Sequence, residues 1–159
     1  MGEYDLVKAV LTELGGIEFW QVAMQPGKPF AFGTIDGTPL FGLPGNPVSV
    51  FVAFEQFVRP ALLHMMGAPH VLRPQLAGIL DEDIQTNPDK TVFVRVNVTW
   101  AGTVPHARAS GGQDSNVLSA LASADALAVI PVGVGDLSAG SDVTLEMFRH
   151  PEDRGLSGR

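Results

Sequence analysis

The pattern of apolar and polar positions predicts two helices in the first half of the chain. Residues 5–14 place apolar side chains three and four positions apart, and the glycine pair that follows is typical of a helix end. Residues 48–66 are apolar around much of the helix circumference, so we expect this second helix to be covered on more than one side. Pro60 disfavours helical geometry at Arg59, which predicts a kink or a restart of the helix there.

Strand patterns surround and follow the second helix. Residues 29–35 and 38–43 flank an Asp-Gly turn and predict either a hairpin or two short buried strands. Residues 91–100 alternate strictly, with valines on one face of a strand and the side chains of Thr91, Phe93, Arg95, Asn97 and Thr99 on the other. Further strands are expected at 17–24, 126–133 and 142–148, and a short helix at 115–124.

The organisation of the sequence changes near residue 68. Residues 67–76 have the composition of a linker, and short alternating runs separated by turn residues follow them. We therefore expect an α/β segment over 1–70, a small β-barrel or sandwich over 71–150, and a polar, flexible tail over 151–159.

Composition narrows the class of function. Ten Lys and Arg residues oppose seventeen Asp and Glu residues, and the basic residues are scattered, which argues against nucleic acid or an anionic membrane as a partner. The chain has no cysteine, which excludes disulfides and thiolate chemistry, and its four histidines have no metal-ligand spacing. We find no secretory signal and no apolar run long enough for a membrane span, and we expect a soluble protein.

The loop that precedes the second helix is a candidate binding site. In the sequence LPGNPVSV, Asn46 is expected to cap the helix and Pro47 to occupy its first position. A helix start after a glycine-containing turn favours an oxyanion, although ordinary capping explains the same residues. Lys28, in the sequence QPGKP, is either a ligand contact or a solvated side chain. Arg95 is either a third ligand contact or a surface-facing position of its strand.

Two long segments carry a resemblance to a known family. Residues 18–33, EFWQVAMQPGKPFAFG, and residues 40–67, which contain LPGNPVSV and FVRPAL, resemble the molybdopterin molybdotransferase family, called MoeA in bacteria and represented by the gephyrin E-domain in animals. VFVRVNV and residues 111–133 resemble the C-terminal β-domain of that family. The resemblance implies the C-terminal half of a doubly wound, molybdopterin-binding α/β domain followed by a small all-β barrel.

The resemblance also implies a function. Members of the family insert molybdate into adenylylated molybdopterin and release AMP with the help of Mg²⁺, as cytoplasmic homodimers of four-domain subunits. On this interpretation the chain is the C-terminal part of a longer enzyme, and Met1 is an internal methionine of that enzyme. The alternative is a non-catalytic molybdopterin-binding or scaffold module. A generic nucleotide-binding domain is disfavoured, since the sequence contains neither GxGxxG nor GxxxxGK[ST].

The resemblance assigns roles residue by residue. Asp5 corresponds to an active-site acid that follows a Gly-Gly-x-Ser segment, and Lys28 to the lysine of PGKP; both are expected to be catalytic. Gln21 and Gln25 stand where many members carry lysines. No metal ligand is assigned. The expected substrate-binding residues are Pro44, Gly45, Asn46, Pro47, Ser49, Arg95 and Ser115.

Overall fold

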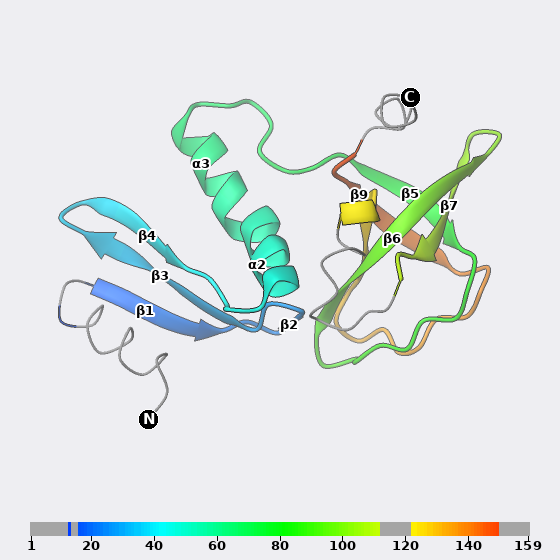
Figure 1. The fold of residues 1–159 in the computed structure, drawn as a ribbon, viewed down its shortest axis with the longest axis horizontal. Helices are drawn as coiled ribbons and strands as arrows, with labels where there is room; N and C mark the ends of the chain where they lie inside the picture. Colours follow the sequence, from blue (N-terminus) through cyan, green and yellow to red (C-terminus); the bar gives the residue numbers. More distant parts are fainter. Residues whose placement is uncertain (1–12, 14–15, 112–121, 150–159) are drawn as a thin grey trace.

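The computed structural model describes residue 13, residues 16–111 and residues 122–149. The first part is a three-stranded sheet formed by β1 (Gly16–Gln21), β3 (Pro29–Ile35) and β4 (Thr38–Gly42), in the order β1-β3-β4 and antiparallel throughout (Figure 1). Of the helix expected at 5–14, only Glu13 lies within the described residues, and it is helical. Most of the helix expected at 115–124 also lies outside them.

The strand expected at 17–24 divides between two sheets. β1 ends at Gln21, and after a turn in which the Met24 amide donates to the Val22 carbonyl, the short strand β2 (Met24–Gln25) pairs elsewhere. The expected hairpin is confirmed, because β3 pairs with β4 in register. Its turn residues Asp36 and Gly37 have φ values of 50° and 78°, the left-handed geometry that an Asp-Gly hairpin turn requires.

The long helix runs from residue 47 to residue 65 in three pieces: α2 (Pro47–Ala53), the π-helical η1 (Phe54–Val58) and α3 (Arg59–Met65). The expected restart is confirmed, because α3 begins at Arg59 directly after the π-helical turn, and Arg59 itself is helical, with a φ of −58° and a ψ of −49°. Pro60 lacks an N–H and its ring crowds the carbonyl four residues earlier, and the wide π turn directly before it accommodates that ring.

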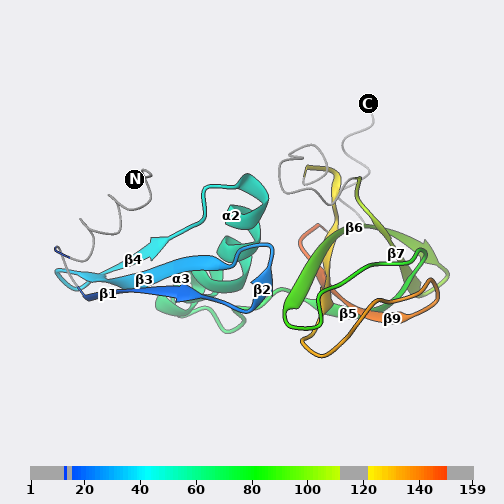
Figure 2. The same ribbon diagram turned by 90° about the horizontal axis from the view of Figure 1, so that it is seen from below.

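The second part is a closed five-stranded barrel. It contains β5 (Gln75–Leu80), β6 (Thr91–Ala101), β7 (Val104–Ala109), β8 (Ala126–Ile130) and β9 (Asp142–Met147). The order β6-β7-β5-β9-β8 returns to β6 through a β6–β8 pairing, so the fold is a barrel and not a sandwich (Figure 2). β8 ends directly before Pro131, which has no N–H to continue the ladder. The expected linker at 67–76 extends too far, because β5 begins at Gln75.

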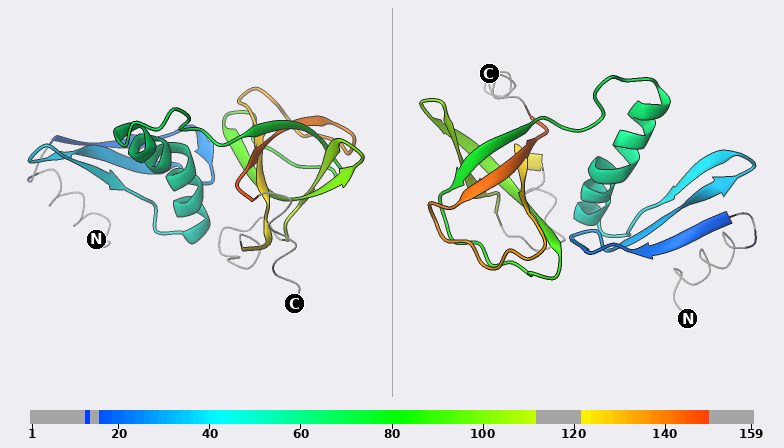
Figure 3. Two further views of the ribbon diagram at one scale, coloured as in Figure 1. Left: turned by 90° about the horizontal axis from the view of Figure 1, so that it is seen from above. Right: turned by 180° about the vertical axis from the view of Figure 1, so that it is seen from behind.

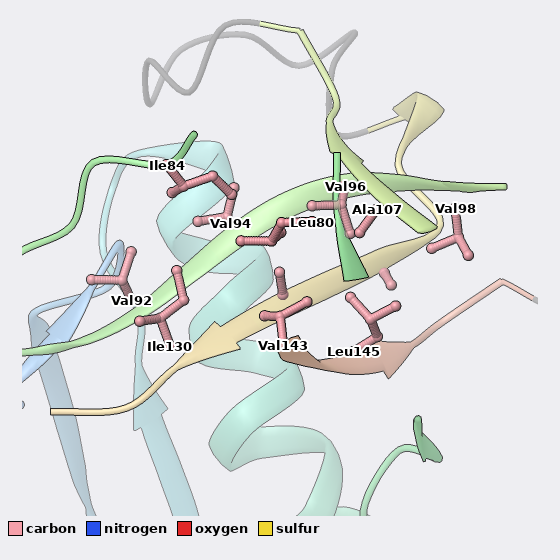
Figure 4. Packing of buried hydrophobic residues seen from close by; sticks show 12 residues of the cluster. Leu80, Ile84, Val92, Val94, Val96, Val98, Ala107, Ile130, Val143 and Leu145 are labelled. Atoms are coloured by element: carbon pink, nitrogen blue, oxygen red, sulfur yellow. The ribbon is translucent and has the colours of Figure 1, made fainter. Parts of the chain in front are cut away.

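The valines of β6 point into the barrel, as the alternation predicts. Val92, Val94 and Val96 pack there with Leu80 and Leu145 (Figure 4). The opposite face of the same strand is also buried, because Phe93 joins Met24, Val52 and Leu127 in a second apolar cluster. This junction cluster connects α2 to the outside of the barrel.

The helical segment therefore has two covered faces. Ala53 and Val58 pack against Phe30 of the sheet, while Val52 packs in the junction cluster, and the helix lies between sheet and barrel (Figure 3). This confirms the expectation that the helix is covered on more than one side. β2 adds a backbone link, since Met24 and Gln25 pair in parallel with Thr91 and Val92.

Candidate functional site

The loop at 44–49 has the local structure that its sequence predicts. The Asn46 side-chain oxygen accepts hydrogen bonds from the amides of Val48 and Ser49, at 3.1 and 3.4 Å, and Pro47 begins α2. The Asn46 side chain therefore already satisfies two of the first-turn N–H groups. Gly45 is exposed, and a Cβ at this position would meet nothing within 4 Å.

The turn that carries Lys28 lies against the start of α2. The Val22 amide donates to the Lys28 carbonyl at 2.9 Å, and the peptide bond between Gln25 and Pro26 is cis. Gly27 packs beside the backbone of Ser49, and the Lys28 side chain is exposed. The two loops singled out by the sequence therefore form one continuous surface.

Arg95 lies in the middle of β6 and is only 1% exposed. The interpretation of this residue as a surface-facing position is therefore wrong. The outer face of β6 is covered at this point, so period-two alternation does not bring the side chain to solvent. The Arg95 carbonyl accepts a hydrogen bond from the Ser110 amide at 2.8 Å, which fixes the strand beside the end of β7.

A cleft of about 520 Å³ lies between the α/β segment and the barrel, and Arg95 lines it. Of the expected site residues that the structure describes, Arg95 alone is in the lining. Lys28 lies two residues after the lining residue Pro26, and Pro47 and Ser49 lie on either side of the lining residue Val48. Asp5 and Ser115 lie outside the described residues. The full lining is Gln25, Pro26, Val48, Glu82, Asp83, Ile84, Gln85, Val92, Phe93, Val94, Arg95 and Ala109.

Two acidic residues of the cleft were not anticipated. A Glu82 carboxylate oxygen accepts from the Ala109 amide at 2.6 Å, and an Asp83 carboxylate oxygen accepts from the Ala139 amide at 2.8 Å. These bonds attach the segment after β5 to the barrel rim. The only sequence signal for them is the acidic run at 81–83, which by itself is typical of a solvated turn. Gln25 was noted as a position where many family members carry lysine, and it lines the same cleft.

The described part of the chain offers neither a metal centre nor a membrane-spanning helix. No group of three or more His, Asp or Glu side chains is placed to hold a metal ion there. Within the same residues, no helix is long and apolar enough to cross a membrane.

Comparison with known proteins gives a class for each part. Residues 1–64 match the family described as "Probable molybdopterin binding domain", and residues 77–148 match "MoeA C-terminal region (domain IV)". The class is thus a segment of a molybdopterin-binding-type α/β domain joined to a MoeA-type barrel. The chain belongs to the MoeA family, and residues 77–148 correspond to its C-terminal region.

Individual relatives agree with this assignment. The chain is 35% identical over 153 residues to a molybdopterin molybdenumtransferase of Haemophilus influenzae, with 94% of this chain and 38% of that protein covered. It is 39% identical over 149 residues to molybdopterin molybdenumtransferase 2 of Mycobacterium tuberculosis, with 89% and 36% covered. The chain therefore spans little more than a third of the length of these relatives.

A solved structure supports the fold. The crystal structure of a molybdopterin biosynthesis MoeA protein from Pyrococcus horikosii superimposes with a TM-score of 0.73 at 29% identity, covering 92% of this chain and 35% of that one. The confirmed expectation is an α/β segment followed by a β-barrel of the MoeA type.

Proposed function

We propose that this chain forms part of the substrate cleft of a molybdopterin molybdenumtransferase, an enzyme of molybdenum cofactor biosynthesis. The reaction is the insertion of molybdate into adenylylated molybdopterin with release of AMP. The observation that carries the proposal is the position of a buried arginine, Arg95, in a cleft beside two rigid loops. The names of the relatives supply the reaction class.

The lining of the cleft suits a flat ring with an anionic substituent. Val48 and Phe93 offer apolar surface for the pterin ring. The Arg95 guanidinium has five N–H donors, enough to retain a protein contact and still donate to a phosphate oxygen. Because Arg95 is only 1% exposed, such a charge-assisted hydrogen bond is less weakened by water than it is at a surface.

The other expected site residues take supporting roles in the proposal. Lys28 offers a second cation from the turn beside Pro26, and Gly45 leaves the loop backbone open to a ligand. Asn46 and Pro47 hold that loop through the helix cap, with Pro44 and Ser49 buried on either side. Asp5 as a catalytic acid and Ser115 as a polar contact rest on the family resemblance alone.

The Mg²⁺ that the resemblance implies finds no ligand set in the described part of the chain. No three carboxylate or imidazole groups meet there, and Glu82 and Asp83 each use one oxygen for a backbone amide. We therefore assign no step of the reaction to a metal held by these residues. A homodimeric, cytoplasmic full-length enzyme, with domains divided near residue 70, is part of the same proposal by resemblance.

The reaction itself is the test. The full-length enzyme of the proposal, which contains this chain as its C-terminal part, is mixed with adenylylated molybdopterin, Mg²⁺ and molybdate, and AMP is quantified by chromatography. The expected result is AMP release that depends on molybdate. Saturable pterin binding without molybdate-dependent AMP release would contradict the transferase proposal and favour a non-catalytic binding module. Absence of binding would contradict both.

A further inference from the structure

A buried acid on the π-helical turn binds the linker that leads to the barrel. Glu55 of η1 is only 7% exposed, and Arg73 holds it with two parallel hydrogen bonds. The Arg73 Nε lies 2.8 Å from Glu55 Oε2, and the Arg73 Nη2 lies 2.9 Å from Glu55 Oε1. This bidentate geometry is the strongest arrangement for a guanidinium and a carboxylate.

Arg59 extends the same network along the helix. Its Nε lies 3.8 Å from Glu55 Oε2, and its Nη1 donates to the carbonyl of Val71 at 2.9 Å. The linker is therefore attached at residue 71 and at residue 73, directly before β5 begins at Gln75. We call Glu55, Arg59 and Arg73 the Glu55 clamp.

A neighbouring contact links the same helical turn to the barrel. Gln56 Nε2 donates to Glu146 Oε2 of β9 at 2.6 Å, and Gln75 Nε2 of β5 donates to Glu146 Oε1 at 3.1 Å. Successive residues of η1 thus hold the linker and the barrel. By contrast, strand pairing across the junction covers, among the described residues, only two residue pairs, Met24 with Thr91 and Gln25 with Val92.

The clamp lies on the path to the cleft. β5 starts beside Arg73 and runs directly into residues 82–85, which line the cleft on the barrel side. The opposite wall contains Val48, one and a half to two helical turns before Glu55 on the same continuous helix. A change in the angle between helix and barrel therefore changes the distance between the two walls.

We propose that Arg73 and Glu55 are positioning residues: the Glu55 clamp sets the orientation of the barrel against the α/β segment and thereby the width of the cleft. Removal of Arg73 leaves the buried Glu55 carboxylate with only the longer Arg59 contact. The orientation that encloses the carboxylate is then less favourable, and the barrel samples other angles.

Arg73 remains charged under ordinary conditions. The pKa of the Arg73 guanidinium is raised above its usual value, because it donates hydrogen bonds to the Glu55 carboxylate and lies beside that negative charge, while partial burial acts in the opposite direction. When the pKa of a base is raised in the folded protein, the interaction stabilises the fold at every pH below the ordinary pKa. That stabilisation is lost only as pH rises through the raised pKa. Deprotonation of Arg73 therefore does not release the clamp near neutral pH.

The test measures orientation directly. The chain contains no cysteine, so the exposed residues Thr38 of the sheet and Ser138 of the barrel are replaced by Cys and spin-labelled. Double electron–electron resonance then gives the distribution of distances between the two labels. We expect a narrow distribution in the labelled parent and a broader or shifted one in Arg73→Gln. Arg73→Lys, which keeps the charge but loses the two-pronged geometry, is expected to lie between them.

Matched controls make the result decisive. Arg108→Gln removes one exposed barrel charge without touching the clamp and is expected to leave the distribution unchanged. If Arg73→Gln does not fold by circular dichroism, Glu55→Gln/Arg73→Gln leaves no buried charge unpaired and is used instead; a broader distribution is again expected. A folded clamp variant with the parental distance distribution would overturn the proposal.

A second readout rests on the proposed function. If only about a fifth of Arg73→Gln molecules hold the competent orientation, the apparent Kd for adenylylated molybdopterin rises about fivefold. An unchanged Kd in a variant with a broadened distribution would overturn the link between clamp and cleft. Failure of the parent protein to bind this ligand contradicts the proposed function, whereas the distance measurement tests the orientation without any ligand.

Discussion

Gly27 lies against the carbonyl oxygen of Ser49: a Cβ at Gly27 would approach that oxygen to 3.5 Å and the Met24 Cε to 3.0 Å. The φ of Gly27 is +105°, a backbone conformation that residues other than glycine rarely adopt. The turn that carries Lys28 therefore packs against the first turn of α2. This contact joins the two loops into one wall beside the cleft.

The Gly27 contact predicts a stability effect. Gly27→Ala is expected to destabilise the fold by about 1–3 kcal/mol, because the new methyl group forces strain at a positive φ and displaces Met24. Urea denaturation followed by circular dichroism measures the change. An unchanged midpoint would mean that the turn is free to move away from α2.

Gly45 predicts the opposite combination. Its φ is not positive and its Cβ position is open, so Gly45→Ala is expected to leave the stability unchanged or to raise it by about 0.4–1 kcal/mol. If the ligand approaches the loop backbone here, the same methyl group lowers the affinity for adenylylated molybdopterin.

Gly135 of the barrel is the matched control, because its Cβ position is equally open and its φ is also not positive. Gly135→Ala is expected to affect stability as Gly45→Ala does and to leave the affinity unchanged, as measured by denaturation and calorimetry. If Gly45→Ala binds the ligand with the parental affinity, Gly45 is not part of the binding surface.

The cap of α2 predicts a smaller loss. Asn46→Ala removes the acceptor for the Val48 and Ser49 amides and is expected to cost about 1 kcal/mol. For a domain of this size, that loss lowers Tm by about 2–4 °C in differential scanning calorimetry. Asn46→Asp keeps an acceptor at the helix start and is expected to retain the parental Tm within about 1 °C. If Asn46→Asp lowers Tm as much as Asn46→Ala does, the cap does not act through this acceptor.

Local signals account for what the sequence predicted correctly. The cap at Asn46, the Asp-Gly turn at residues 36 and 37 and the valine alternation of β6 depend on neighbouring residues alone. The α/β-then-barrel order follows from the change of pattern near residue 68. Arg95 was the third candidate from the sequence itself, and the family resemblance assigned it to the same pocket as the two loops.

Long-range packing accounts for what the sequence did not predict. Arg95 and Phe93 occupy what alternation marks as the outer face of β6, and they are buried because α2 and the residues around the cleft cover that face. Glu55, a single acid in an apolar helix, was the available sign of a buried partner. Its partner Arg73 is 18 positions away in a linker, where no periodic pattern indicates contact.

The junction cluster predicts that the two parts unfold together. Leu127 is 1% exposed and packs with Met24, Val52 and Phe93 across the junction. The chain has one tryptophan in each part, Trp20 and Trp100. In Trp20→Phe and Trp100→Phe the remaining tryptophan reports on one part, and the two urea midpoints are expected to coincide.

Leu127→Ala is introduced into both single-tryptophan variants. It is expected to lower the free energy of unfolding measured in each by about 3 kcal/mol, because it opens a cavity that the two parts share. Leu76 of β5, which is 36% exposed and lies outside the cluster, provides the control. Its replacement by Ala is expected to cost much less. Separate midpoints for Trp20 and Trp100 would show that the junction does not couple the two parts.

The central claim is that Arg95 binds an anionic pterin in the cleft, and the affinity of Arg95→Gln for adenylylated molybdopterin tests it most directly. Loss of a hydrogen bond to a charged group is worth about 1.5–3 kcal/mol, so Kd is expected to rise about tenfold or more in Arg95→Gln and to stay unchanged in Arg108→Gln. Both variants are first shown to be folded by circular dichroism. Equal Kd values for the parent and a folded Arg95→Gln would contradict the account.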